Sequence, residues 1–376
     1  MSASISCKDA LDAIRRGERL PADVVRQLGE EQPGDFFQTI IEGLADSFNP
    51  ADAAAYEEMM TAWIPPRPRV APEIPELVEA VYVLSRVTLG ADIKITSSIL
   101  SAAKKHFGAT IFFVGNRKSA ELFASDASIS WLEADYPRSG PVSHRIQFAH
   151  DLRRRLDRPA SIVIDPDSRM TQLGLVPVCE PKRYFHFPSR TADSAANLSQ
   201  LVRDWTWDTF GESGQAYIAP RPVPEKTADP FATLSLGVGQ NHAKRVGGEF
   251  ETKLIRKLGE KFRTIWIDRG AGGEEATRVT EAANASGYMD RVRFWEGSFA
   301  GFASLISQSA FYAGYDSAGQ HAAAASGVPL VTFFAGAPSA RFRDRWSPAG
   351  SGRIEVIDGS SMPPEACLER LSALLE

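Results

Sequence analysis

The stretch that decides the fold is AFYAGYDSAGQHAAAASGVPLVTFFAG, residues 310–336. Its first apolar run ends at Asp316, a segment of small residues follows, and a second apolar run begins after Pro329. Short buried strands that alternate with helices are typical of parallel β-sheets, because each parallel connection needs a crossover segment. The stretch therefore predicts a strand, a helix and a second parallel strand.

The turn after the first of these strands has the residues of an anion-binding site. Ser317 can cap the helix, and the small side chains of Ala318 and Gly319 let a ligand approach the amides of the first turn. His321 lies in the same turn, at the positive end of the helix dipole. This spacing favours a diphosphate site, although a tightly packed alanine-rich helix capped by Asp316 and Ser317 explains it equally well.

Similar units extend in both directions from this stretch. One series of apolar runs begins after the proline-rich segment IAPRPVPEKTADP, with helical segments between FATLSLGVG, TIWIDRG, VRFWEG, AFYAGYD, PLVTFFAG and RIEVID. An earlier series comprises AVYVLS, TIFFVG, ISWLEA and SIVID. We predict an α/β protein with two Rossmann-like, doubly wound domains, residues 76–220 and 221–376, which bind ligands in the cleft between them.

The residues before the first series form a third region. Residues 5–62 carry apolar residues at helical spacing, interrupted by Gly, Pro and Asn. The proline-rich stretch from Pro65 to Pro75 then breaks any helix and favours an extended linker. We predict an N-terminal helical extension over residues 1–75. Its apolar stripes are expected to pack on the first Rossmann-like domain or, in a homo-oligomer, on a partner.

Composition restricts the function and the compartment. The 376 residues are 43% hydrophobic and 24% charged, as in a soluble globular protein, and the net charge of -5 argues against nucleic-acid binding. The three cysteines are far apart in sequence, which fits a reducing cytoplasm. The apolar runs are too short to span a bilayer, and the N-terminus lacks the apolar stretch of a signal peptide. We expect a cytoplasmic protein, with peripheral contact at the inner membrane left open.

Residues 310–336 resemble the donor-binding motif of glycosyltransferase family 9, the heptosyltransferase-like enzymes. This motif has the form Asp-Thr/Ser-Gly-x-x-His and is followed by a small-residue helix, Gly-Val-Pro and a strand. Asp316, Ser317 and His321 match the motif, whereas Ala318 stands in place of the usual glycine. The resemblance implies a GT-B fold whose second domain binds a nucleotide-sugar donor.

Two further segments are similar to donor-binding segments of this family. SLGVGQNHAKRVGGEF, residues 235–250, resembles a loop with a phosphate-binding lysine, which implies donor contacts for Gln240 and Lys244. IDRGAGGEEATR, residues 267–278, resembles the family's Gly-Ala-x-x-Glu segment and selects Glu274 as partner of the donor sugar or ribose hydroxyls. Considered without the resemblance, Lys244 is a solvated loop charge and Glu274 a first-turn acid favoured by the helix dipole.

A candidate general base lies in SRVTLGADIKITSSIL, residues 85–100, which is similar to the family's Ser-x-Gly-Asp loop. The match selects Asp92, which would deprotonate the acceptor hydroxyl as it attacks the anomeric carbon. Ala91 intervenes between Gly90 and Asp92, whereas the family has the glycine directly before the aspartate. As a residue at a helix start, Asp92 is also explained as a cap.

The segment DPDSRMTQLGL, residues 165–175, contains an Asp-x-Asp pair. The pair directly follows an expected strand and has no histidine nearby, so we interpret it as a turn and predict no metal site. Ser168 and Arg169 follow at the same edge of the sheet and are candidates for contact with the acceptor.

The resemblance implies an inverting, metal-independent glycosyltransferase without a cofactor, in which Lys244 and the helix at Ser317 neutralise the leaving diphosphate. The expected partners are a nucleotide-diphosphate sugar, with heptose as the leading donor, and a glycan, glycolipid or protein acceptor. Synthesis of cell-surface glycans such as lipopolysaccharide is the implied process. Two alternatives remain open: a sugar-nucleotide epimerase of the same fold, and a non-catalytic nucleotide-sugar binding or scaffold protein, which a misplaced Asp92 would favour.

Overall fold

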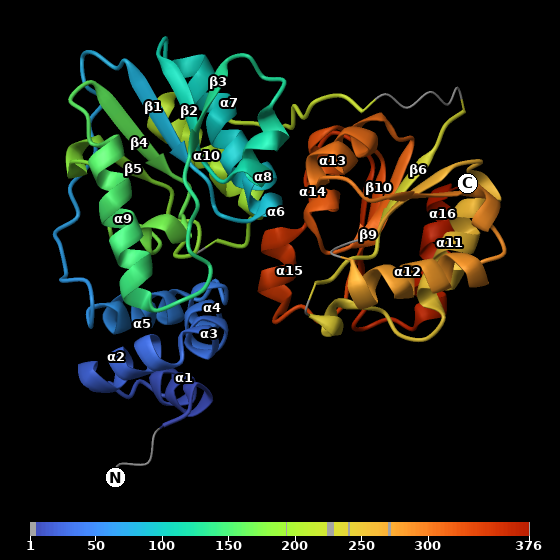
Figure 1. The fold of residues 1–376 in the computed structure, drawn as a ribbon, viewed down its shortest axis with the longest axis horizontal. Coiled ribbons are helices and arrows are strands. Elements are labelled where there is room, and N and C mark those ends of the chain that lie inside the picture. Colours follow the sequence, from blue (N-terminus) through green and yellow to red (C-terminus); the bar gives the residue numbers. More distant parts are fainter. Residues whose placement is uncertain (1–4, 193, 224–228, 240, 270–271, 376) are drawn as a thin grey trace.

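The computed structural model describes residues 5–192, 194–223, 229–239, 241–269 and 272–375. It contains two parallel sheets, each flanked by helices, and a group of N-terminal helices below the first sheet (Figure 1). The first sheet comprises β1 (Ala80–Leu84), β2 (Thr110–Gly115), β3 (Ile129–Glu133), β4 (Ser161–Asp165) and β5 (Tyr184–His186). The second comprises β6 (Ala232–Ser235), β7 (Ile265–Asp268), β8 (Val292–Trp295), β9 (Phe311–Tyr315), β10 (Leu330–Phe334) and β11 (Ile354–Asp358). We call each sheet with its helices the first half and the second half.

Both sheets have the strand order of a doubly wound fold. The first is ordered β3-β2-β1-β4-β5 and the second β11-β10-β9-β6-β7-β8, with parallel pairing throughout. The order reverses between β1 and β4 and between β6 and β9. We call the crevices outside the carboxyl ends of these two pairs the first and the second switch point, because open α/β sheets bind ligands there. The predicted pair of Rossmann-like halves is confirmed.

The connecting helices cover the faces of the two sheets, which is why strands such as β4 and β9 are buried along their whole length. In the first half they are α6 (Leu89–Ala91), η2 (Asp92–Thr96), α7 (Ser97–His106), α8 (Arg117–Ala120), η3 (Glu121–Phe123), α9 (Val142–Leu156), η4 (Arg169–Thr171), η5 (Pro181–Arg183) and α10 (Leu198–Phe210). In the second half they are η6 (His242–Lys244), α11 (Phe250–Lys261), α12 (Gly273–Ala285), η7 (Met289–Arg291), α13 (Phe299–Gln308), α14 (Ala318–Ala325), α15 (Ala340–Trp346) and α16 (Pro364–Leu375). None of the helices in the described ranges has the length and apolar character needed to cross a bilayer.

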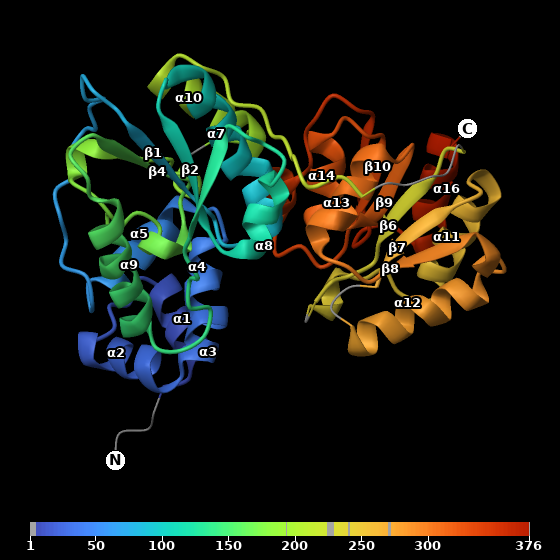
Figure 2. The same cartoon turned by 45° about the horizontal axis from the view of Figure 1, so that its top comes forward.

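The N-terminal helices pack onto the first half, as Figures 1 and 2 show. They are α1 (Cys7–Arg15), α2 (Ala22–Glu31), α3 (Pro33–Asp35), η1 (Phe36–Ile41), α4 (Glu42–Ala45) and α5 (Pro50–Met60). Leu28 and Ile40 of these helices share one hydrophobic cluster with Val87 and Ile146 of the first half. The apolar stripes read from the sequence therefore have their partner within the chain, and the expectation that they pack on the first half is confirmed.

Helix α15 lies on the side of the second half that faces the first (Figure 1), and its side chains contact the first half. Its Phe342 and Trp346 rings lie 6.2 and 6.4 Å from the ring of Phe48, which follows α4. Its Arg345 guanidinium donates hydrogen bonds to three backbone carbonyl oxygens in the loop before α10. The aromatic packing and hydrogen bonds of α15 therefore fix the position of the second switch point relative to the first.

Candidate active site

The second switch point brings together two of the predicted donor-binding residues. β6 ends at Ser235 and β9 at Tyr315, so the loop to η6 and the turn to α14 leave the sheet side by side. The Lys244 ammonium lies 2.9 Å from an Asp316 carboxylate oxygen, and the Gln320 amide donates to the other oxygen at 2.6 Å. Residues that are 72 positions apart in sequence thus form one polar group at the predicted site.

The start of α14 is tightly packed against the sheet. Ser317 occupies the N-cap position in an extended conformation, and its hydroxyl lies 3.3 Å from the Tyr312 hydroxyl instead of capping the helix. A Cβ on Gly319 would collide with the Tyr312 hydroxyl and lie 2.9 Å from Ser235 Oγ. Gly319 is therefore required for close packing of the helix on the sheet, while Ala318 supplies the first residue of the helix.

His321 is buried where the two halves meet. A Cβ on Gly90 of the first half would lie 3.2 Å from the His321 ring, and the Trp346 ring is centred 6.0 Å away. Burial, together with the nearby positive charges of Lys94 and Lys244, lowers the pKa of His321 well below its ordinary value. The imidazole is therefore neutral at pH 7 and can donate or accept a hydrogen bond without adding charge.

Lys94, which the sequence did not single out, is buried at the same junction. Its ammonium donates to Ser199 Oγ at 2.9 Å and to the Ser347 carbonyl oxygen, across the two halves, at 2.7 Å. Burial lowers the pKa of Lys94 to about 7, and the attraction of Asp316 opposes that shift only in part. The sequence signal that could have identified Lys94 is the presence of a charged residue between the two isoleucines of the segment DIKIT.

The predicted donor-binding carboxylate Glu274 is exposed, and the adjacent Glu275 contacts the loop after β6 instead. Glu274 lies on the surface in the first turn of α12. Glu275 accepts hydrogen bonds from the backbone N–H groups of Val238 and Gly239, at 2.6 and 3.3 Å. Glu275 thereby shapes the loop that leads to Lys244. The predicted donor contact Gln240 lies outside the described residues.

At the first switch point, the predicted general base does not reach the cleft. Asp92 is 0% exposed, and its carboxylate accepts hydrogen bonds from Ser85 Oγ at 2.7 Å, from the Arg86 backbone N–H at 2.7 Å and from Thr96 Oγ1 at 2.9 Å. Burial raises its pKa even though these donors favour the charged form. In this conformation Asp92 holds the loop after β1, and no carboxylate oxygen is presented to an acceptor. The role of Asp92 as a general base therefore stays a prediction, which requires its carboxylate to leave these hydrogen bonds.

The segment that contains Asp92 is π-helical. Asp92–Thr96 form a π-helical segment, η2, between the short α6 and the longer α7. A π-helical turn accommodates one more residue than an α-helical turn, which is how a helix absorbs a single insertion. Ala91, which separates Gly90 from Asp92, is the last residue of α6, and the Asp92 carboxylate that follows it faces the interior.

The Asp-x-Asp pair and Ser168 are also buried. Asp165 accepts from Thr171 Oγ1 at 2.5 Å, from the Ser168 N–H at 2.6 Å and from the Tyr184 hydroxyl. Ser168 donates to the Ser85 carbonyl oxygen at 2.6 Å, so it ties β4 to β1 and is not available to an acceptor. Within the described ranges, no group of three or more His, Cys, Asp or Glu residues is arranged to hold a metal ion.

Arg169 does lie at the first switch point, beside three further buried arginines. These four residues, which we call the arginine cluster, are Arg86, Arg145, Arg169 and Arg190. Arg169 lies 3.0 Å from a carboxylate oxygen of Asp46, which comes from the N-terminal helices. Of these four arginines, only Arg169 lies in a segment whose sequence indicated a site, because the others come from distant segments.

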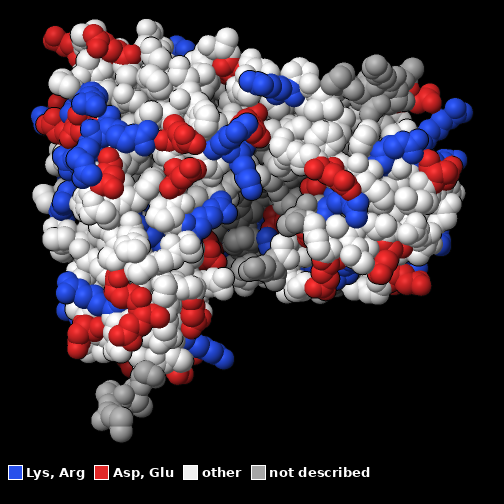
Figure 3. Space-filling view, in the orientation of Figure 1, with Lys and Arg blue, Asp and Glu red and all other residues white. Residues whose placement is uncertain are grey.

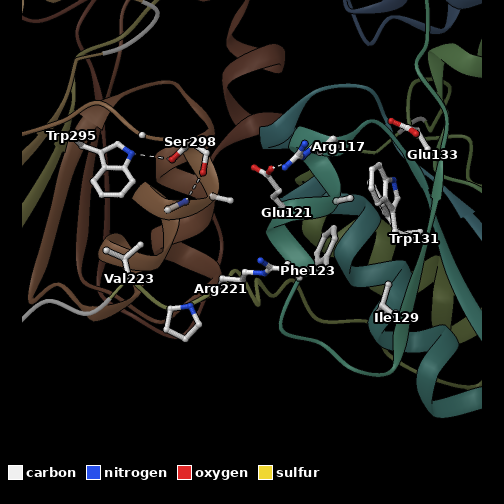
Figure 4. A pocket seen from close by; sticks show the side chains of 17 residues that line it. Arg117, Glu121, Phe123, Ile129, Trp131, Glu133, Arg221, Val223, Trp295 and Ser298 are labelled. Atoms are coloured by element: carbon white, nitrogen blue, oxygen red, sulfur yellow. Dashed lines mark hydrogen bonds and ion pairs between the residues drawn. The ribbon is translucent and has the colours of Figure 1, made fainter.

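A separate pocket of about 930 Å³ lies between the halves at the side of the outer strands β3 and β8. Trp295 and Ser298 of the second half lie across from Glu121, Phe123 and Trp131 of the first (Figure 4). None of the predicted site residues lines this pocket. The molecule is also hollowed between the halves in the space-filling view, with Lys and Arg side chains on the adjoining surface of the first half (Figure 3).

Comparison with protein-family models gives no match, and comparison with curated protein sequences gives none either. Solved structures do match. A glycosyltransferase of family 9 from Veillonella parvula is 14% identical, with a TM-score of 0.61 over 81% of this chain and 99% of that chain. E. coli heptosyltransferase WaaC, solved with ADP, is 17% identical, with a TM-score of 0.58 over 78% and 99%.

The E. coli ADP-heptose lipopolysaccharide heptosyltransferase II is 18% identical, with a TM-score of 0.52 over 79% of this chain and 98% of that chain. These likenesses cover nearly the full length of each solved chain and therefore include both halves. The chain has the GT-B fold of the family 9 glycosyltransferases, as the resemblance in its sequence predicted.

Proposed function

We propose that this protein transfers a sugar from a nucleotide-diphosphate donor to an acceptor hydroxyl, with inversion at the anomeric carbon and without a metal ion. The observation that carries the proposal is the Lys244–Asp316 pair beside the start of α14 at the second switch point. An open α/β sheet binds its ligand at such a point, and both a lysine and a helix N-terminus favour a diphosphate.

The charges at this point suit a leaving group that gains negative charge. In the absence of a donor, Lys244 is neutralised by Asp316, so a bound diphosphate would compete with Asp316 for the same ammonium. The amides at the start of α14 and the neutral His321 can supply hydrogen bonds without a further charge. Stabilising the diphosphate as the glycosidic bond breaks is the largest contribution that such a site can make.

Removal of the proton from the acceptor hydroxyl is less well supported by the geometry than stabilisation of the diphosphate. An attacking hydroxyl needs a base within hydrogen-bond reach, and Asp92 is the candidate that the sequence resemblance selected. Its carboxylate would reach the cleft only if Ser85 and Thr96 released it. We retain Asp92 as the residue to test for this step.

A second function is favoured by the burial of Asp92. A protein that binds a nucleotide sugar without transferring it needs Lys244 and α14 but no base at the first switch point. Such a protein would serve as a nucleotide-sugar binding or scaffold protein. The two functions share the donor site and differ in turnover.

One experiment separates them. Calorimetric titration with ADP, GDP, UDP and dTDP should identify one nucleoside diphosphate that binds, and its sugar nucleotides should bind as well. ADP-heptose comes first among the donors, because two of the solved structures above are heptosyltransferases. Release of nucleoside diphosphate on incubation with glycan, glycolipid and protein acceptors supports transfer. Binding with no release over hours supports the second function, and no binding of any nucleotide contradicts both.

A further inference from the structure

The arginine cluster occupies a position in the first half equivalent to that of the predicted donor site in the second. Arg86 follows β1, and Arg169 follows β4, the two strands between which the sheet order reverses. Arg190 follows β5, and Arg145 reaches this edge from α9. Ligands of open α/β sheets bind in this crevice, so the position itself is that of a binding site.

The positive charges of the cluster are only partly balanced. Asp46 lies 3.0 Å from Arg169 and 3.1 Å from Arg190, and Asp167 lies 3.1 Å from Arg190. Glu42 is a third nearby carboxyl group, and burial raises its pKa against the attraction of Arg169. Four buried guanidinium groups thus face two paired carboxylates, and buried cations that lack a full set of partners are costly.

Three guanidinium nitrogens of the cluster have no hydrogen-bond partner among the described residues, although they are buried. They are Nη1 of Arg169 and Nε and Nη1 of Arg145, on side chains that are 8% and 1% exposed. The guanidinium carbons of Arg169 and Arg145 lie over the Phe37 ring, at 5.0 and 3.8 Å from its centre. Contact with an aromatic ring does not use the hydrogen-bonding capacity of these three N–H groups, and guanidinium N–H groups bind the oxygens of phosphate or carboxylate in pairs.

The cluster is connected to the donor side through α15. The Arg86 guanidinium lies 5.9 Å from the centre of the Trp346 ring, and that ring lies 6.0 Å from the His321 ring of the second switch point. A molecule anchored at the arginine cluster is therefore held beside the place where a donor would bind.

We propose that the arginine cluster, closed by the N-terminal helices, binds an oxyanion group of the acceptor, either a phosphate monoester or a carboxylate. The proposal rests on the proposed function, because it assigns the acceptor of that reaction to an anionic class. Phe37 and Asp46 make the N-terminal helices a wall of this site. Asp46 occupies part of it with an internal carboxylate, which an incoming anion would displace from Arg169.

The test uses the full chain and three probes: glucose 6-phosphate, glucuronate and glucose, titrated by calorimetry at constant ionic strength. Lys244→Ala is the background, so that phosphate does not bind at the donor site. One or both anions should bind and glucose should not, and Arg169→Gln should weaken anion binding at least ~10-fold. Arg154→Gln is the matched control, because Arg154 is an exposed arginine of α9 paired with Asp151, and its variant should bind like the parent.

A second variant keeps the test valid if Arg169→Gln fails to fold. Asp46→Asn removes the competing carboxylate and should tighten anion binding several-fold, whereas a purely structural Asp46 would lower the melting temperature and leave affinity unchanged. Stronger binding of glucose 6-phosphate assigns the site to phosphate, and stronger binding of glucuronate assigns it to carboxylate. Absence of anion binding, or equal binding by Arg169→Gln, overturns the proposal. The titrations with nucleoside diphosphates test the donor site independently, so failure of one proposal is distinguishable from failure of the other.

Discussion

At the second switch point, one ion pair lies beside the tightly packed start of α14, whereas at the first switch point four arginines, Asp46, Asp167 and the N-terminal helices line the crevice. The topology is the same in both sheets. The second point takes Lys244, Asp316 and His321 from two neighbouring loops of its own half, whereas the first takes Asp46 from the N-terminal helices and its arginines from four separate segments of the first half. We therefore propose different ligands for these equivalent positions, a diphosphate in the second half and a single oxyanion group in the first.

The first prediction concerns the buried carboxylate of the first switch point. Asp92→Asn replaces an acceptor of three hydrogen bonds with an amide that cannot accept all of them, so it should lower the free energy of unfolding by about 1–3 kcal/mol. Urea denaturation of the variant and the wild type measures this loss. If Asp92 instead serves mainly as a base, stability changes little and turnover falls by roughly 10²- to 10⁴-fold.

The second prediction concerns the ion pair of the second switch point. Lys244→Ala removes the cation that a diphosphate would share with Asp316, so the affinity for the nucleoside diphosphate should fall ~10- to 100-fold. Calorimetry measures the loss, and Lys257→Ala on the surface of α11 is the matched control. Equal affinities of Lys244→Ala and the wild type would remove Lys244 from the donor site.

The third prediction concerns Lys94, which links the two halves. Because burial lowers its pKa to about 7 from an ordinary value of 10.5, the unfolded chain binds more protons than the folded chain between these pH values. The free energy of unfolding should therefore rise with pH from 7 to 9, relative to Lys94→Met, on the order of 1 kcal/mol per pH unit. Urea titrations at pH 7, 8 and 9 measure this difference. Parallel pH dependences for the variant and the wild type would contradict it, and Lys257→Met is the control.

The sequence predicts the fold well because both sheets are made of local apolar runs that alternate with helices. Of the strands, it misses β5 (Tyr184–His186), whose three residues are too few for a recognisable pattern. On the donor side, Lys244, Asp316 and His321 lie within or near short motifs, and the structure brings them together at the end of one sheet.

The rest of the site depends on information that a linear pattern does not carry. Glu274 and Glu275 are adjacent, and only the rotation of α12 decides which of them contacts the loop before Lys244. The direction in which Asp92 points follows from its hydrogen bonds to Ser85, Arg86 and Thr96, and the arginine cluster depends on the packing of segments far apart in sequence. Such features follow from tertiary structure, so the first switch point could not be read from the sequence as the second could.

The last prediction carries the smallest expected effect. The oxygens of Asp165 already accept from Thr171, Tyr184 and a backbone N–H, and Asp167 is paired with Arg190, so a metal ion would have to displace several donors from the first switch point. At the second switch point, Lys244 and the start of α14 supply the positive charge that a diphosphate needs. Nucleoside diphosphate affinity and sugar transfer should therefore be the same in EDTA as in magnesium. Loss of transfer on chelation, restored by manganese or magnesium, would assign Asp165 and Asp167 to a metal and make the two switch points more alike than their present contacts indicate.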